Sequence, residues 1–138
     1  MKCLTICQPW AHAIMHWGKD VENRGWATKH RGEMLIHAGK TKTAYDEQDP
    51  DDWKECGFTI PKWDAMPRGL IIGVVELVDC IPSDPGLPYY VPGHGPNVWA
   101  DGKFLWLLRN PRLLKEPIPY RGLLFLFDVP DELLKGKL

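Results

Sequence analysis

Three charged side chains near the N-terminus are the residues of this sequence best suited to chemistry. Lys19, Glu22 and Arg24 lie within the segment GKDVENRG, directly after an apolar stretch. On an extended strand, Glu22 and Arg24 project to one face, and Val21 and Asn23 project to the other. Charges of alternating sign hold one another in place and lower the cost of burial. The spacing therefore predicts that the three side chains converge on one concave surface, with Glu22 in direct contact with Lys19 or Arg24.

This charged cluster fits two kinds of function. Lys and Arg side chains bind phosphate or a base edge, and a Glu orients them or accepts a hydrogen bond from a base amino group. Amide hydrolysis instead needs a base that activates water and a donor to the amide oxygen. A desolvated Lys19 beside Arg24 would release a proton more easily, whereas an ionised Glu22 keeps Lys19 charged. This opposition favours binding over catalysis. A solvated edge strand with weak ion pairs is the purely structural alternative.

Aromatic residues are frequent, at 11 % of the chain with seven Trp. The spacing of three of them is typical of a buried core: Trp10, Trp17 and Trp106. Others follow the charged cluster or fall in a long loop, where they are candidates for stacking on a base: Trp26, Tyr89, Tyr90 and Trp99. Loop aromatics also form lids over small cores, so both interpretations stay open.

The cysteines and histidines do not have the spacing of metal ligands. The four cysteines (Cys3, Cys7, Cys56 and Cys80) are scattered, so they are expected to be reduced and mostly buried thiols. His12 and His16 have i, i+4 spacing, but no third ligand accompanies them, and two histidines on a helix surface are expected. The sequence predicts neither a metal site nor a cofactor.

The overall composition is that of a globular chain with balanced charge. The 138 residues are enough for one domain, and the formal net charge is -1. This balance argues against a protein that coats nucleic acid through its total charge, but it leaves room for a local basic groove. No apolar run reaches the roughly 18 residues that span a membrane, and the N-terminus does not have the pattern of a signal peptide. A cytoplasmic location without a membrane partner is expected, and the oligomeric state stays open.

Thirteen Gly and thirteen Pro divide the chain into short elements. Strands are expected at 3–6, 21–26, 34–37, 69–79, 104–108 and 123–129, the longest being 69–79. A helix is expected to begin at Pro9 and to end at Gly18. An acidic helical insertion near 43–56 and a long Pro/Gly loop near 81–101 interrupt the strands. Short strands without regular helical crossovers favour one mostly β domain over 1–138, a small β-barrel with peripheral helices.

Two segments of the chain resemble the ASCH domain, a PUA-like family: LTICQPWAHAI and GKDVENRGWATKHRGEMLIHAGK. Members have a strand that ends in Gln-Pro-Trp-Ala, a Gly-x-Lys-x-x-Glu-x-Arg signature and an Ile-His-Ala strand. Lys19, Glu22 and Arg24 occupy the charged positions of the signature, while Trp17 replaces its first Gly and Gly18 follows. The segment WLLRNPRLLKEPIPYRGLLFLF is similar to the closing strands of the family. Residues 41–66 and 81–100 are expected to be elaborations of this chain.

The resemblance implies a PUA-like α+β barrel with the first helix packed beside a cleft in which the signature residues face a ligand. It also implies a module that binds RNA or a nucleotide, with DNA as a further possible partner. The residues expected to bind the ligand are Lys19, Glu22, Arg24, Trp26, Tyr90 and Trp99.

A second function is implied by small relatives that are amidohydrolases and deacetylate N4-acetylcytidine with a Lys, a Thr and a Glu. In those relatives the Thr lies three residues after the Lys. Here Glu22 holds that position relative to Lys19, and Thr28 lies off the pattern. As a nucleoside amidohydrolase, the chain would use Lys19 and Glu22, with Glu76 of the 69–79 strand as a further carboxylate.

Overall fold

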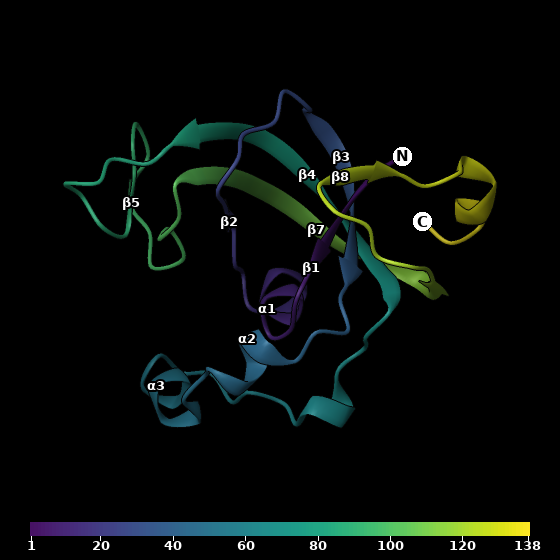
Figure 1. Cartoon of the computed structure of the whole chain (residues 1–138), viewed down its shortest axis with the longest axis horizontal. Helices are drawn as coiled ribbons and strands as arrows, with labels where there is room; N and C mark the ends of the chain where they lie inside the picture. The colour runs from purple at the N-terminus through teal and green to yellow at the C-terminus, as the bar shows by residue number, and fades with distance from the viewer.

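The computed structural model describes residues 1–138 and contains a curled six-stranded sheet that forms a half-barrel (Figure 1). The strands of this sheet are β1 (Lys2–Ile6), β2 (Val21–Arg24), β3 (Gly32–Ala38), β4 (Leu70–Pro82), β7 (Phe104–Pro119) and β8 (Leu126–Asp128). Their order is β2-β7-β4-β3-β1-β8. β1 and β3 are parallel, and every other neighbouring pair is antiparallel. The expected PUA-like, mostly β fold of the α+β class is confirmed.

Helix α1 (Trp10–His16) connects β1 to β2 and closes one side of the half-barrel. Its buried residues Ala11, Ile14 and Met15 join the largest apolar cluster, which they share with residues of β1, β3, β4 and β7. The helix begins one residue after Pro9, and His12 N donates to the Gln8 side-chain oxygen at 2.9 Å. This bond satisfies one of the amides that a helix N-terminus leaves free. The buried face of α1 thereby fixes where β2 begins.

The core lies on both faces of the sheet. The largest cluster faces α1 and contains Trp106, which is fully buried as its spacing predicted. A second cluster, with Leu35, Ile71 and Phe127, covers the opposite face. A smaller third cluster forms around Val21 of β2, beneath the loop that follows β4. Successive strand residues point to opposite faces of the sheet. Because apolar side chains lie on both faces, other parts of the chain must pack against both faces to bury them.

Strand β7 is the longest strand, with 16 residues, whereas the sequence predicted 69–79 to be the longest and 104–108 to be a short strand. Residues after Leu107 have β4 on one side only, because β2 pairs with β7 from Phe104 to Leu107. Proline is tolerated at such an edge, so Pro111 does not end the strand. Register shifts against β4 and a positive φ of 54° at Asn110 accompany the bend in β7.

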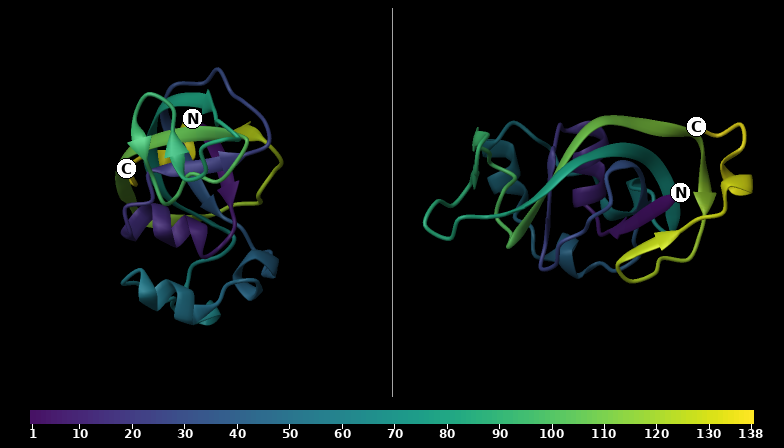
Figure 2. Two further views of the ribbon diagram at one scale, coloured as in Figure 1. Left: turned by 90° about the vertical axis from the view of Figure 1, so that its left-hand side faces the viewer. Right: turned by 90° about the horizontal axis from the view of Figure 1, so that it is seen from above.

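The two segments outside the main sheet are ordered elements. The segment that the sequence predicts to be an acidic insertion forms two short helices, α2 (Thr43–Asp46) and α3 (Pro50–Glu55), followed by the 3-10 turn η1 (Trp63–Ala65). The long Pro/Gly loop contains a small hairpin of β5 (Tyr90–Val91) and β6 (Gly95–Pro96). A final 3-10 turn, η2 (Asp131–Leu134), follows β8. Helix α1 lies between the curled sheet and the insertion (Figure 2, left). None of the helices is both long and apolar enough to cross a membrane.

Candidate functional site

Lys19 is a buried cation at the turn between α1 and β2. Gly18 adopts a φ of +72°, which favours glycine, and the amide of Lys19 then donates to Ala13 O at 3.1 Å. The Lys19 side chain is 3 % exposed, and its Nζ donates to Glu22 Oε1 at 3.1 Å and to the Val21 carbonyl oxygen. The Nζ also lies 5.8 Å from the centre of the Trp10 ring. The charge is therefore held by a carboxylate, a carbonyl and an aromatic face.

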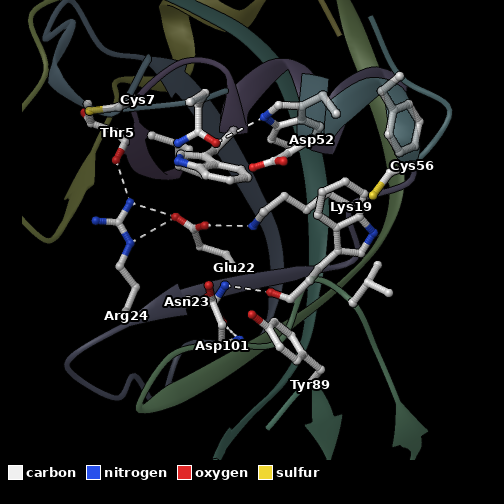
Figure 3. A pocket seen from close by; sticks show the side chains of 17 residues that line it. Thr5, Cys7, Lys19, Glu22, Asn23, Arg24, Asp52, Cys56, Tyr89 and Asp101 are labelled. Atoms are coloured by element: carbon white, nitrogen blue, oxygen red, sulfur yellow. Dashed lines mark hydrogen bonds and ion pairs between the residues drawn. The ribbon is translucent and has the colours of Figure 1, made fainter. Parts of the chain in front are cut away.

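Glu22 lies between two cations. Its side chain is 8 % exposed, with Oε1 facing Lys19 and Oε2 facing Arg24. Arg24 Nε donates to Oε2 at 3.2 Å, and Arg24 Nη2 lies 3.0 Å from the same oxygen. Arg24 Nη2 also donates to Thr5 O at 2.7 Å, which ties β2 to β1 (Figure 3). The three charges converge as the strand spacing predicts, with Glu22 in contact with both cations.

The pairing of β2 with β7 orients this row of charges. Glu22 lies opposite Trp106, whose side chain belongs to the cluster under α1, and Arg24 lies opposite Phe104. Val21 points to the other face and packs in the cluster beneath the loop. The alternation of strand side chains therefore places Glu22 and Arg24 on the side of the sheet that faces α1.

A cavity of about 810 Å³ opens beside the row of charges. Its lining includes Lys19, Glu22 and Arg24, together with Trp10 and the end of β1 from Thr5 to Cys7. This volume lies within the roughly 300–1,000 Å³ of pockets that bind small molecules. The cavity can therefore hold one flat, partly polar group the size of a nucleoside.

The acidic insertion supplies an aromatic wall of this cavity. Trp53 of α3 has its ring centre 5.4 Å from that of Trp10 and 6.0 Å from that of Trp99. Phe58 stacks on Trp17 at 4.8 Å. Trp10 and Trp17 are thus half-buried members of an aromatic cluster. Trp10 also packs against the largest apolar cluster, whereas Trp17 belongs to none of the apolar clusters, so the prediction of a buried core residue is wrong for Trp17. They face α3 because the insertion covers the outer side of α1.

The loop after β4 supplies an adjoining wall, with Tyr89, Val98, Trp99 and Asp101 in the lining. Asn23 of β2 anchors this loop, because its Nδ2 donates to Trp99 O at 2.7 Å. Its Oδ1 accepts from the backbone amides of Asp101 at 3.0 Å and Gly102 at 2.9 Å. Asn23 was not among the residues predicted for the site. An asparagine between two charged residues gives no sequence signal for a hydrogen bond to Trp99, which lies 76 residues away in the chain.

Two of the aromatic residues predicted for the site lie elsewhere. Trp99 lines the cavity, but Tyr90 does not, and its neighbour Tyr89 does. Trp26 also lies outside the lining, and its ring packs edge-on against Trp106 at 4.8 Å and Phe125 at 5.0 Å. Its carbonyl accepts a hydrogen bond from Trp106 Nε1 at 3.2 Å. These contacts give Trp26 a packing partner at each side.

Glu76 lies apart from Lys19 and Glu22, the other two residues that the sequence predicts for catalysis. Its neighbours Val75 and Leu77 point into the cluster beneath α1, so Glu76 points to the opposite face. There it accepts two hydrogen bonds from Arg109, at 2.9 and 2.8 Å. These bonds lower the pKa of Glu76 below its ordinary value. Glu76 lies outside the cavity lining.

The cavity lining is close to neutral and shows no metal-binding group. Two cations, Lys19 and Arg24, stand against three carboxylates, those of Glu22, Asp52 and Asp101. Burial raises the pKa of the Cys7 thiol, an effect that Arg24 partly offsets, so this cysteine is held as a thiol. No group of three or more His, Cys, Asp or Glu side chains has the geometry to hold a metal ion. The lining therefore offers hydrogen bonds and aromatic surfaces.

Comparison with known proteins connects this geometry to a family. Residues 4–88 match the ASCH domain. The chain belongs to the ASCH domain family. It is 28 % identical over 128 residues to Activating signal cointegrator 1 of Homo sapiens, with 87 % of this chain and 21 % of the human protein aligned. The protein of the same name from Mus musculus is 28 % identical over 123 residues, with 87 % and 21 % aligned. The chain spans about a fifth of the length of these relatives.

The ASCH match covers only part of the site. It includes the row of charges and the segment that carries Trp53 and Phe58, but it ends before Trp99 and Asp101. The loop wall and strands β7 and β8 therefore lie outside the matched residues. The loop wall that Asn23 anchors therefore comes from residues that follow the ASCH match.

Proposed function

We propose that this ASCH domain is a nucleic-acid-binding module that takes one base of a single-stranded nucleic acid, or of a nucleotide, into the aromatic-walled cavity. The observation that carries the proposal is the buried row of Lys19, Glu22 and Arg24 in the wall of a cavity lined by tryptophans. A base is flat and carries polar atoms at its edge. It needs an aromatic face for stacking and fixed donors and acceptors for its edge.

The aromatic walls support stacking. Trp10, Trp53 and Trp99 all line the cavity, and they come from α1, α3 and the loop after β4. Base stacking on an aromatic side chain contributes about 1–3 kcal/mol per base and works for every base. Side chains from three separate elements surround one volume, so a base that enters it loses contact with water on more than one side.

The charged row supports recognition of the base edge. Lys19 Nζ carries three donors, and the chain uses two of them, on Val21 O and Glu22 Oε1. Arg24 carries five N–H donors, and its Nη1 has no hydrogen-bond partner within the chain. The remaining donors suit the carbonyl oxygens and ring nitrogens of a base. Glu22 holds both cations in place, so the donors are oriented before a ligand arrives.

The alternative proposal is an amidohydrolase that deacylates a pyrimidine nucleoside such as N4-acetylcytidine. A buried lysine beside a carboxylate in a nucleoside-sized cavity supports it. The positions of the two candidate carboxylates, Glu22 and Glu76, support hydrolysis less well. Both carboxylate oxygens of Glu22 are occupied by ion pairs with Lys19 and Arg24, so neither faces an incoming water alone, and Glu76 points away from the cavity. The geometry supports binding better than hydrolysis.

A fluorescence titration tests the binding proposal, because three tryptophans line the cavity. Nucleosides, nucleoside 5′-monophosphates and short single-stranded RNA and DNA are titrated into the protein. We expect saturable quenching, and we expect Arg24→Ala and Trp99→Leu to weaken binding about tenfold or more. Trp63→Leu is the matched control, because Trp63 lies outside the cavity lining, against Arg68 and Tyr45. The absence of saturable binding by every ligand would refute the proposal.

The same protein samples test the alternative. N4-acetylcytidine is incubated with the wild type and with Lys19→Ala, and the release of cytidine is followed by chromatography. We expect no turnover above the uncatalysed rate. Turnover that Lys19→Ala abolishes would replace the binding function with the amidohydrolase function.

A further inference from the structure

A second cavity of about 770 Å³ adjoins the first. The two cavities share Thr5 and Cys7, at the end of β1, so one short stretch of chain separates them. Further lining comes from the segment from Gly39 to Thr41 after β3 and from the segment from Pro119 to Leu124, which begins at the end of β7. The two cavities therefore meet at the end of β1.

The second cavity differs from the first in its charge. Its lining contains the cations Lys40 and Arg121 and no carboxylate, whereas three carboxylates line the first cavity. Of the six arginines in the sequence, five pair with a carboxylate: Arg24, Arg31, Arg68, Arg109 and Arg112. Arg121 has no ion pair and no side-chain hydrogen bond within the chain, and the same is true of Lys40. Two unpaired cations in one hollow favour an anion there.

The floor of the second cavity is a buried polar network. His37 is 2 % exposed, its Nε2 donates to Tyr120 O at 2.7 Å, and its Nδ1 lies 3.1 Å from the Thr5 hydroxyl. Gly122 comes so close that a Cβ there would lie 2.9 Å from Thr5 Oγ1 and 2.9 Å from His37 Cε1. The close approach of Gly122 holds the segment that carries Arg121 against the end of β1.

Thr5 connects the two cavities through its own hydrogen bonds. Its carbonyl oxygen accepts from Arg24 of the first cavity, and its hydroxyl contacts His37 of the second. Thr5 thus connects the row of charges in the first cavity to the second cavity, which holds the unpaired cations. A base in a nucleic acid is always attached, through its sugar, to a phosphate. The geometry therefore offers a cationic cavity beside a cavity in which carboxylates accompany the cations, as a base with its attached phosphate requires.

We propose that the second cavity binds, through Lys40 and Arg121, the phosphate attached to the nucleotide whose base occupies the first cavity. This inference rests on the proposed function and narrows its ligand to a phosphorylated nucleotide or a single strand, in preference to a free nucleoside. Arg binds phosphate with paired N–H donors, and Lys adds a compact positive charge. Such contacts position the ligand, while the base edge is read in the first cavity.

The test uses a double variant and a control with the same change in charge. Lys40→Gln/Arg121→Gln removes both cations of the second cavity. Lys115→Gln/Lys135→Gln removes two exposed cations that line neither cavity. Each protein is titrated with a nucleoside, its 5′-monophosphate and a short single-stranded oligonucleotide of the same base, at several salt concentrations. All four substituted residues are exposed, so folding should be preserved.

We expect the double variant to bind the oligonucleotide about tenfold more weakly at low salt, with unchanged affinity for the nucleoside. The slope of log K against log salt should fall in magnitude by about 1.4, at roughly 0.7 for each lost contact with a single strand. An equal loss for the 5′-monophosphate identifies a terminal phosphate as sufficient, and a loss for the oligonucleotide alone identifies an internal phosphodiester. The control double variant should behave as the wild type.

Two results would overturn the inference. One is a double variant whose oligonucleotide affinity and salt slope match those of the control. The other is a parallel loss of nucleoside affinity, because a phosphate site cannot act on a ligand without phosphate. Both results leave the base site intact if the wild type binds nucleoside. A wild type that binds no nucleoside, nucleotide or oligonucleotide instead refutes the proposed function itself.

Discussion

Asn23 holds the backbone of Trp99 at the wall of the first cavity, with Asn23 Nδ2 and Trp99 O 2.7 Å apart. The Oδ1 of the same side chain accepts from the amides of Asp101 and Gly102. Gly102 is required at this place, because a Cβ there would lie 2.5 Å from the Asn23 Cβ. One amide side chain on β2 therefore uses both its donor and its acceptor to place the loop wall.

The first prediction concerns this anchor. Asn23→Ala removes three hydrogen bonds to the loop and should lower the free energy of unfolding by about 1–3 kcal/mol. The backbone amides of residues 97–102 should exchange with deuterium faster, and nucleotide binding should weaken. Asn23→Asp keeps the acceptor and loses the donor, so its effect on exchange should be intermediate. Unchanged exchange over 97–102 in Asn23→Ala would show that other contacts place the loop.

The second prediction concerns the carboxylate between the two cations. Glu22→Ala leaves Lys19 buried without its ion pair and should lower the free energy of unfolding by about 3–5 kcal/mol. Urea unfolding followed by circular dichroism measures the change. Glu76→Ala is the matched control, because Glu76 also pairs with an arginine but lies in a solvent-exposed pair. An effect of Glu22→Ala no larger than that of Glu76→Ala would contradict the argument from burial.

The third prediction concerns stability against pH. Burial lowers the pKa of His37 below its ordinary value of 6.5, with Lys40 acting in the same direction against the bond to Tyr120. The folded protein therefore favours the neutral ring. As pH falls below about 6.5, the unfolded chain takes up a proton before the folded chain does, so stability should decrease toward the lowered pKa.

Urea midpoints at pH 7.5, 6.5 and 5.5 measure this effect. Stability should fall between pH 6.5 and 5.5, and His37→Gln should flatten that fall. His12 contributes with the same sign, because burial and His16 lower its pKa. His12→Gln therefore serves as the comparison that separates the two residues. A stability that rises on acidification would contradict the assignment of a neutral His37.

The fourth prediction concerns thiol reactivity. Burial raises the pKa of Cys3 to about 12, and burial also raises the pKa of Cys7, whereas Cys56 is exposed. Because the thiolate is the reactive form, iodoacetamide at pH 8 should label Cys56 first and Cys3 only after unfolding. Mass spectrometry of peptides gives the order. A bound nucleotide should slow the labelling of Cys56, which lines the first cavity. Early labelling of Cys3 would show that β1 opens in the native protein.

The sequence by itself determined the row of charges. Glu22 and Arg24 are two residues apart on a strand, and Lys19 lies two residues before that strand, directly after the turn at Gly18. Each of these relationships depends on the backbone of fewer than ten residues, so local geometry settles it. The mostly β fold was also predictable, because it follows from the spacing of short apolar segments and turn residues.

Only the tertiary structure decided which partners the row of charges receives. Asn23 meets Trp99 and Thr5 meets His37 because β2 and β1 take particular neighbours in the sheet. Glu76 points away from the cavity because strand alternation places it opposite Val75 and Leu77. Arg121 is free because no carboxylate reaches it in the folded chain. These contacts depend on the pairing of distant strands, and that pairing minimises the free energy of the whole core rather than of any local segment.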